Sequence, residues 1–319
     1  MEFRSIIEKK GMTSRNLVLG ANGFLGQHLV EAFIKRGEKA KAYVSLKSSR
    51  AKPSFEGVEW IYGDFVSEQR WLQILDGVEI CYHLISTTSP KRSNEDPIFD
   101  VDSNIIGTLR LLEAAKQTCT KIIFASSGGT IYGNSKGLLT ETDQTHPLNS
   151  YGITKLSIEK YLSLYKTLYD LKSISLRISN PYGMYQSSQA GQGAATIFLN
   201  KVLRGEPIDI WGDGTVVRDY IYVSDVIEAM LASSIYDGDT QIFNIGSGVG
   251  VSLLDLISEI EYTTQKSAKI NYFPARKFDV LKNVLNIDLA CSKLRWKPSV
   301  SLKEGLQITE CWLKQHNKY

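Results

Sequence analysis

The chain has 319 residues, of which 43% are hydrophobic and 22% are charged, and its formal net charge is +3. This composition is typical of a globular protein with a large core, and it leaves room for two domains. Lys and Arg are scattered along the chain, which argues against nucleic acid or a membrane surface as a partner. No apolar run approaches the length of about 20 residues that crosses a bilayer.

Two further features bear on the compartment. The four cysteines show no C-x-x-C spacing, which predicts reduced thiols in a cytoplasmic protein and no metal site. Residues 1–12 precede the first predicted strand and lack the apolar segment of a signal peptide, so we expect them to form an N-terminal extension.

Short apolar segments alternate with helical ones between residues 16 and 246. The predicted strands are NLVLG (16–20), KAYVSL (41–46), IYGDF (61–65), VEICYHLIS (78–86), KIIFASS (121–127), SISLRISN (173–180) and QIFNIG (241–246). The predicted helices are 27–36, 104–117, one opening near Tyr151, 194–204 and 224–234. Such alternation is typical of a parallel sheet covered on both faces. The sequence therefore predicts an α/β fold, a Rossmann-type doubly wound parallel sheet, with a smaller mixed α/β domain toward the C-terminus.

A glycine-rich loop separates the first predicted strand from the first predicted helix. It reads Gly20-Ala21-Asn22-Gly23-Phe24-Leu25-Gly26, a G-x-x-G-x-x-G spacing. Glycines let the backbone approach a pyrophosphate, and a helix N-terminus offers free N–H groups and a positive dipole end. Ordinary turns also carry glycines, but the strand–turn–helix context favours nucleotide binding.

The second and third predicted strands bear on the choice of cofactor. An NAD site usually carries an acid about 20 residues after the loop, and this position falls near Ser45, where the sequence has no carboxylate. Basic residues follow, Arg50 among them, and they suit a 2′-phosphate. The predicted cofactor is therefore NAD or NADP, with NADP favoured, although a solvated basic loop could equally flank NAD. Asp64, after the third strand, either accepts from the adenine amino group or caps its own loop.

A second chemical signal lies in SYGITK, residues 150–155. Asn149 and Ser150 provide a helix N-cap, and residues four apart on a helix share one face, so Tyr151 and Lys155 should point the same way. A nearby ammonium favours the phenolate and lowers the pKa of a tyrosine toward a range useful for acid–base chemistry. The alternative is an exposed tyrosine and lysine on a surface helix.

These motifs stand in the order of a known family. The glycine loop, Asp64, HLIS (83–86), Asn104-Ile-Ile-Gly-Thr, SSGGTIYG (126–133) and Tyr151-x-x-x-Lys155 are followed by RISNPYG (177–183), GDGTVVRDYIYVSD (212–225), FNIGSG (243–248), Pro274-Ala-Arg276 and LRWKP (294–298). With them the chain resembles the extended short-chain dehydrogenase/reductase family, and most of all its NAD-dependent epimerase/dehydratase branch acting on nucleotide sugars. The resemblance extends from Arg15 to Pro298.

The resemblance implies catalytic roles. Tyr151 would be the general acid/base at a sugar hydroxyl, and Lys155 would lower its pKa and hold the nicotinamide ribose. Relatives often have a Ser or Thr four residues before the tyrosine of the strand-end motif, a position that is Gly128 in this chain. We therefore expect Ser127 to hold the reacting oxygen, with Thr130 as the alternative.

The same resemblance implies two sets of ligand-binding residues. The cofactor set comprises Gly20, Asn22, Gly23, Phe24, Leu25, Gly26, Ser45, Arg50, Asp64, Phe65, Leu84, Ser86, Asn104, Tyr151 and Lys155. The substrate set, for a nucleotide-diphosphate sugar, comprises Thr88, Ser127, Asn180, Arg218 and Arg276. Residues 13–180 plus about 221–246 are expected to form the dinucleotide-binding domain, and residues 181–220 plus 247–319 the nucleotide-sugar domain. A homodimer is expected from the family.

Three functions are compatible with the sequence. A 4-epimerase of a UDP-hexose, working by transient oxidation at C4, is favoured by the overall motif set. An NADPH-dependent 4-keto-6-deoxy nucleotide-sugar reductase is favoured by the missing acid near Ser45. A noncatalytic NAD(P)-sensing protein is disfavoured by the intact Tyr151 and Lys155. Trp211 or Tyr272 is expected either to stack on the base or, as aromatic residues more often do, to pack in the core.

Overall fold

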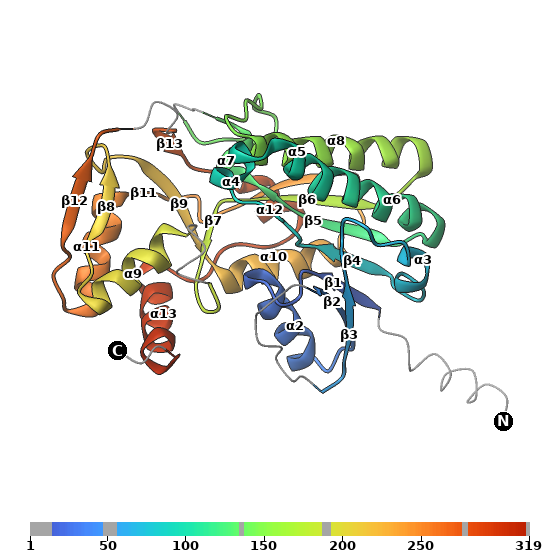
Figure 1. Cartoon of the computed structure of the whole chain (residues 1–319), viewed down its shortest axis with the longest axis horizontal. Coiled ribbons are helices and arrows are strands. Elements are labelled where there is room, and N and C mark those ends of the chain that lie inside the picture. Colours follow the sequence, from blue (N-terminus) through green and yellow to red (C-terminus); the bar gives the residue numbers. More distant parts are fainter. Residues whose placement is uncertain (1–14, 47–55, 134–136, 187–192, 276–279, 317–319) are drawn as a thin grey trace. The chain divides into compact units, whose positions relative to one another are not determined.

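The computed structural model describes residues 15–46, 56–133, 137–186, 193–275 and 280–316. A seven-stranded parallel sheet is its central element (Figure 1). Its strands are β1 (Asn16–Leu19), β2 (Ala40–Ser45), β3 (Val58–Gly63), β4 (Ile80–His83), β5 (Lys121–Ser127), β6 (Ser173–Ile178) and β10 (Ile242–Ile245). They are ordered β10-β6-β5-β4-β1-β2-β3, so the strand order reverses beside β1. This doubly wound order confirms the predicted fold class.

Helices connect and cover these strands. They are α2 (Phe24–Lys35), α3 (Trp71–Ile74), α4 (Pro90–Glu95), α5 (Pro97–Asp100), the π-helix η2 (Val101–Ile106), α6 (Gly107–Thr118), α7 (Gly128–Ile131), α8 (Ser150–Tyr169), α9 (Ala194–Arg204), α10 (Val223–Ile235), α11 (Leu253–Thr264), α12 (Asp288–Lys293) and α13 (Leu302–His316). Strands β1 and β6 are buried at every residue. In β1 three of the four buried residues are apolar, as burial on both faces favours, whereas β6 reads SISLRI and buries Ser173, Ser175 and Arg177 as well.

The predicted strand 173–180 is two strands in the structure. β6 ends at Ile178, and β7 (Asn180–Tyr182) pairs with β9 (Val217–Tyr222) instead. Pro181 lies within β7 and has no N–H to donate, so this segment is unsuited to continue a central strand. The sheet around β9 also includes β11 (Gly250–Ser252) and β13 (Lys282–Asn283), and β8 (Ile208–Trp211) pairs with β12 (Ile270–Phe273) separately.

The predicted helix 104–117 also divides. Its first residues belong to η2, a π-helical stretch, and the α-helical hydrogen bonding begins with α6 at Gly107. A π-turn inserts an extra residue and is frequent at functional sites. Asn104, a predicted cofactor residue, lies in this turn.

Contacts divide the chain into two compact units. Unit 1 comprises Met1–Thr87, Ile98–Ala125 and Ser157–Ile174, and unit 2 comprises Thr88–Pro97, Ser126–Leu156 and Ser175–Tyr319. Unit 1 has a hydrophobic core that includes Leu17, Tyr43, Trp71 and Leu111, and unit 2 contains a smaller cluster around Leu285. The predicted domain boundaries stay a prediction.

The described part of the chain contains neither a candidate membrane span nor a candidate metal site. None of its helices combines the length and the apolar character that crossing a membrane requires. No three or more of its His, Cys, Asp and Glu side chains are grouped so as to hold a metal ion.

Candidate active site

The glycine loop of unit 1 forms a tight turn between β1 and α2. Gly20 has φ +82°, in the region that favours glycine, and its carbonyl accepts the N–H of Gly23 at 2.9 Å. A Cβ on Gly26 would lie 2.2 Å from the Gly20 carbonyl oxygen. Gly23 is the N-cap of α2 and has no side chain with which to cap it. The loop therefore leaves a bare helix N-terminus, which fits the pyrophosphate of a dinucleotide.

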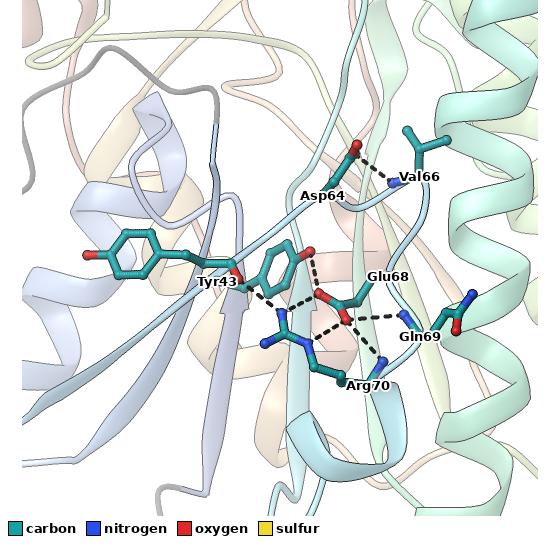
Figure 2. Close-up of polar contacts among 7 residues, drawn as sticks. Tyr43, Asp64, Val66, Glu68, Gln69 and Arg70 are labelled. Atoms are coloured by element: carbon teal, nitrogen blue, oxygen red, sulfur yellow. Dashed lines mark hydrogen bonds and ion pairs between the residues drawn. The ribbon is translucent and has the colours of Figure 1, made fainter.

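The residues expected near the adenosine follow β2 and β3 in unit 1. Ser45 ends β2 and is exposed, beside Gly63 of β3. Figure 2 shows the Asp64 carboxylate accepting the Val66 N–H, at 3.2 Å, which is the loop-capping contact that the sequence offered as one alternative. Contact with adenine stays a prediction. Arg50 lies outside the described residues.

Phe65, the residue after Asp64, has a buried ring. It packs against Trp71 and His83, with ring centroids 5.7 and 5.2 Å away, and is 5% exposed. A Cβ on Gly107 would lie 2.6 Å from the Phe65 ring. The ring therefore belongs to the core of unit 1, and the predicted cofactor contact of Phe65 is untested.

Asn104 holds the segment that follows β4. Its side-chain oxygen accepts the Thr87 N–H at 3.1 Å, and its amide donates to the Thr87 hydroxyl at 2.8 Å and to the Asp100 carboxylate at 2.9 Å. Leu84 and Ser86, the predicted cofactor residues of this segment, lie between β4 and the Thr87 contact. A buried Asn in an apolar helix needs such partners, and here they are Thr87 in the segment after β4 and Asp100 in α5.

Tyr151 and Lys155 lie in the first turns of α8, in unit 2. The Asn149 side chain accepts the Gly152 N–H at 2.8 Å, so Asn149 is the N-cap, as predicted. Lys155 is 4% exposed, and its Nζ lies 5.6 Å from the centroid of the Tyr151 ring. The backbone N–H of Tyr151 donates to Ser93 in α4 at 2.9 Å. The two side chains therefore point the same way, and Lys155 is not a surface lysine.

The hydroxyl candidates lie at the end of β5, also in unit 2. Ser127 is the last residue of β5, and Thr130 is in α7. The Thr130 hydroxyl is buried and has no hydrogen-bond partner among the described residues. A Cβ on Gly152 would lie 2.7 Å from the Thr130 carbonyl oxygen, so this glycine lets α8 approach α7 closely.

Packing explains why a glycine replaces the usual Ser or Thr at position 128. A Cβ there would lie 2.6 Å from the Leu285 side chain and 3.0 Å from the Arg177 carbonyl oxygen. The Gly128 carbonyl also accepts from the Asn283 amide at 3.0 Å. The segment after β13 thus occupies the space that a side chain at this position would need.

Two of the predicted substrate residues of unit 2 lie on or beside β9. Arg218 is in β9, and Asn180, in β7, donates to the Asp219 carbonyl oxygen at 2.9 Å. Thr88 precedes α4 and is half-buried. Arg276 lies outside the described residues.

Two aromatic residues of unit 2 are not in the core, contrary to the more common fate considered for them. Trp211 is 38% exposed and stacks on Phe273 with centroids 5.6 Å apart, and Tyr272 is 58% exposed. Core packing is therefore wrong for both, and the alternative of stacking on a base stays a prediction.

Sequence reasoning missed a buried carboxylate between Arg218 and Tyr220. Asp219 accepts hydrogen bonds from Ser179, from the N–H and hydroxyl of Ser247, and from the N–H groups of Gly248 and Leu285. Burial raises the pKa of this carboxyl. The available signal was an acid inside an otherwise apolar strand, DYIYV, where a surface residue would be out of pattern.

A buried arginine was also missed. Arg177 is 3% exposed, and its guanidinium donates to the Tyr132 hydroxyl at 2.8 Å and lies over the Tyr132 ring. That hydroxyl donates to Asn244 in β10 at 2.6 Å, and burial raises the pKa of Tyr132 to about 12. Arg177 therefore stabilises the segment between β5 and α8, which carries the N-cap of the Tyr151 helix.

The fold and these side chains together define a class of protein. A doubly wound sheet with a glycine loop after its first strand, and a tyrosine and a buried lysine four apart on a helix, are the parts of a dinucleotide-dependent enzyme. Residues 16–246 match the NAD dependent epimerase/dehydratase family, and the chain belongs to this family of enzymes that act on nucleotide sugars.

Relatives match almost the whole chain. It is 35% identical over 298 residues to a dTDP-4-dehydro-6-deoxyglucose reductase of Escherichia coli, covering 91% of this chain and 94% of the reductase. A UDP-glucose 4-epimerase of Thermotoga maritima, solved with UDP-glucose, has a TM-score of 0.89 and 37% identity and covers 94% of this chain and 98% of that one. A UDP-glucose 4-epimerase of Thermus thermophilus in complex with NAD has a TM-score of 0.88 and 31% identity, with coverages of 95% and 100%. The predicted family resemblance is confirmed.

Proposed function

We propose that the protein is an NAD-dependent 4-epimerase of a UDP-hexose. The observation that carries the proposal is the pair formed by Tyr151 and the buried Lys155 in the first turns of α8. The similarity to two UDP-glucose 4-epimerases, one of them with UDP-glucose and one with NAD, supports the substrate and the cofactor.

Tyr151 moves the proton of the reaction. Its phenolate oxygen takes the proton of the sugar C4 hydroxyl as C4 is oxidised, and it returns the proton when C4 is reduced on the other face. Lys155 stabilises the phenolate, and Ser127 or Thr130 donates a hydrogen bond to the reacting oxygen. The Thr130 hydroxyl has no partner among the described residues but is buried from solvent, so Ser127 at the end of β5 is the preferred donor. Bound NAD supplies a reversible hydride acceptor.

Positive charge is required at the diphosphate of the substrate. Arg218 and Arg276 are proposed to pair with its oxygens, because a guanidinium can form two parallel hydrogen bonds to phosphate. Asn180 is proposed to contact the same group or the sugar. The bare N-terminus of α2 and the three loop glycines are proposed to hold the dinucleotide, together with Asp64 and the other predicted cofactor residues.

A 4-keto-6-deoxy nucleotide-sugar reductase is the second candidate. The 35% identity to a dTDP-4-dehydro-6-deoxyglucose reductase supports it, as does the absence of an acid at the end of β2. Such an enzyme exchanges its cofactor at each turnover, whereas an epimerase returns the hydride to the same sugar and keeps the cofactor. The predicted preference for NADP belongs to this alternative.

The released cofactor separates the two candidates. We expect mass spectrometry of the denatured, purified protein to find about one NAD per chain, and turnover of UDP-glucose to UDP-galactose without added cofactor. A chain that binds only added NADPH and consumes it with a 4-keto sugar would reassign the protein as the reductase.

A matched pair of tyrosine variants tests the chemistry. Tyr151→Phe should lower kcat by about 10²- to 10⁴-fold, the usual contribution of a general acid/base, while NAD stays bound. Tyr169→Phe is the control, because Tyr169 lies on the same helix under another lysine, Lys116, at 4.4 Å. Equal turnover in both variants would remove Tyr151 from the mechanism, whereas a wild-type protein that binds the cofactor and turns over neither substrate would be a noncatalytic NAD(P)-sensing protein.

We also propose a homodimer, as the family predicts. The outer face of α8 carries Tyr161, Leu164 and Leu168, which are 36%, 45% and 58% exposed and lie three or four residues apart. Apolar residues exposed at this spacing form one helical stripe, which a second copy would cover. Leu164→Glu with Leu168→Glu should give a monomer in sedimentation analysis; an unchanged mass would contradict this interface.

A further inference from the structure

Unit 1 contains a buried carboxylate that the proposed mechanism does not use. Glu68 is 6% exposed and accepts five hydrogen bonds, from the Tyr43 hydroxyl, from two nitrogens of the Arg70 guanidinium, and from the N–H groups of Gln69 and Arg70. Figure 2 shows these donors converging on its two oxygens. The guanidinium is bidentate, at 2.8 and 2.7 Å, which is the strong geometry for such a pair.

Hydrogen bonds of the cluster formed by Tyr43, Glu68 and Arg70 connect β2 and β3, the two strands that lead to the expected adenosine site. Arg70 also donates to the Tyr62 carbonyl oxygen in β3, at 3.0 Å. Tyr43 lies in β2, and its carbonyl oxygen accepts the N–H of Gly20 at 3.0 Å. Tyr43 therefore contacts the Glu68 carboxylate through its hydroxyl and Gly20, the first glycine of the glycine loop, through its carbonyl oxygen.

The cluster has no spare room on the β3 side. A Cβ on Gly63 would lie 2.2 Å from the Tyr43 hydroxyl and 2.3 Å from a Glu68 oxygen. Gly63 is followed at once by Asp64, whose carboxylate closes the start of the loop by accepting the Val66 N–H. We call residues 64–70, between β3 and α3, the Asp64 loop. Hydrogen bonds of Asp64 fix the conformation at its start, and hydrogen bonds of Glu68 fix it toward its end.

We propose that Glu68 is a positioning residue for the adenosine half of the dinucleotide, acting with Tyr43 and Arg70. The inference rests on the proposed function, because it needs a dinucleotide at the glycine loop. Glu68 does not touch the ligand; it holds the Asp64 loop against β2, and β2 holds Gly20. Without this carboxylate the loop can relax away from β2, so adenosine binding weakens while proton transfer at Tyr151 is unaffected.

Nucleotide release from the purified holoenzyme tests the proposal. NAD would be chased with excess ADP-ribose, which lacks only the nicotinamide and occupies the emptied site, well below the melting temperature of each variant. We expect Glu68→Gln to release NAD roughly tenfold faster, since a buried hydrogen-bonded charge is lost. Arg70→Ala should act in the same direction to a lesser degree. Tyr43→Phe, which removes one hydrogen bond and keeps the ring, should raise the rate of NAD release roughly two- to fivefold.

The controls reproduce the same chemistry elsewhere in unit 1. Glu113 accepts from the Tyr165 hydroxyl at 2.6 Å and pairs with Lys116 at 2.7 Å. Glu113→Gln and Tyr165→Phe remove the matching groups from α6 and α8 rather than from β2 and the Asp64 loop. We expect both to release NAD at the wild-type rate, and kcat to be unchanged in all saturated variants.

The outcomes separate the inference from the proposed function. Wild-type release rates in Glu68→Gln, Arg70→Ala and Tyr43→Phe would overturn the inference, even if their melting temperatures fall, because the cluster would then stabilise only the fold. Equal acceleration in the Glu113→Gln control would overturn it as well. A wild-type protein that holds no dinucleotide and takes up none would overturn the proposed function and the inference with it.

Discussion

Each of the two units contains a buried carboxylate that accepts five hydrogen bonds, and the two differ in their donors. Glu68 in unit 1 receives two of them from the guanidinium of Arg70. Asp219 in unit 2 receives all five from neutral groups, which are hydroxyls and backbone N–H groups of Ser179, Ser247, Gly248 and Leu285. Only one of the two charges is therefore paired with an opposite charge.

The pKa shifts of the two carboxyls have opposite signs as a result. Hydrogen bonds from Arg70 lower the pKa of Glu68 to about 2, whereas burial raises the pKa of Asp219 in spite of its five donors. Desolvation penalises a charge, and neutral dipoles offset it less than a cation does. Glu68 therefore stabilises unit 1 through its charge. Asp219 joins segments of unit 2, and its ionisation costs stability.

The largest expected change in stability comes from replacing Asp219, which connects several segments of unit 2 by hydrogen bonds. Asp219→Asn places an amide donor against groups that are themselves donors, so we expect the free energy of unfolding to fall by about 3 kcal/mol or more. Urea denaturation measures it. Asp213→Asn is the control, because Asp213 is exposed and its carboxylate accepts from Thr215; it should cost under about 1 kcal/mol. Similar losses in both would contradict the role of Asp219.

Two glycine variants each perturb one of these carboxylates by placing a methyl group against it. A Cβ on Gly246 would lie 2.3 Å from an Asp219 oxygen, and a Cβ on Gly63 would lie 2.3 Å from a Glu68 oxygen. Each alanine should cost about 1–3 kcal/mol of stability by overpacking. Gly246→Ala should also raise KM for the nucleotide sugar, and Gly63→Ala should speed NAD release instead. Gly137→Ala, at an open position, is the control; the same kinetic change in both variants would refute the separation.

The opposite pKa shifts predict opposite responses to acid. The pKa of Glu68 is lowered from 4.5, so its stabilisation is complete above about pH 4.5 and is lost as the pH falls toward 2. The raised pKa of Asp219 gives the reverse slope, since protonation relieves its burial. Glu68→Gln should therefore lose less stability than wild type between about pH 5 and pH 2, by on the order of 1 kcal/mol because Arg70 is half-exposed. If the free energy of unfolding fell equally with pH in Glu68→Gln and wild type, Glu68 would have no part in the acid response.

The last prediction concerns the substrate side alone. Arg218→Ala should raise KM for the UDP-sugar roughly tenfold, about 1.4 kcal/mol, because one charge-assisted pairing to phosphate is lost. NAD release should not change. Arg204→Ala is a matched control, since Arg204 lies in α9 and pairs with Glu206 at 2.8 Å. An unchanged KM in the Arg218 variant would withdraw its phosphate role.

Local chemistry made several elements predictable. The helix 194–204 was predicted with the bounds that α9 has, because its apolar period is clear and Gly205 takes the left-handed conformation that ends a helix. The Asn149 cap and the common face of Tyr151 and Lys155 follow from short-range spacing, and the structure has both. Such features depend on residues within one or two turns, so a single sequence contains them.

Other features escaped prediction for a common physical reason. In the π-helix η2 the Asn104 side chain bonds to Thr87, 17 residues away, and after β6 the chain leaves the central sheet because β7 pairs with β9. Both depend on partners distant in the chain. Periodicity assigns Asn104 to an ordinary helix and residues 173–180 to a single strand.

The sequence by itself determined the doubly wound fold, the family, and the residue types of a tyrosine- and lysine-based redox enzyme, because these are written in apolar periods and short motifs. The tertiary structure alone decided which charges are buried. Glu68 looks like a surface acid in the sequence, and only its apolar neighbours set Asp219 apart; in both cases the donors that folding gathers around the carboxylate make its burial tolerable. Folding also leaves no room for a side chain at Gly128. It buries the Thr130 hydroxyl without a partner among the described residues.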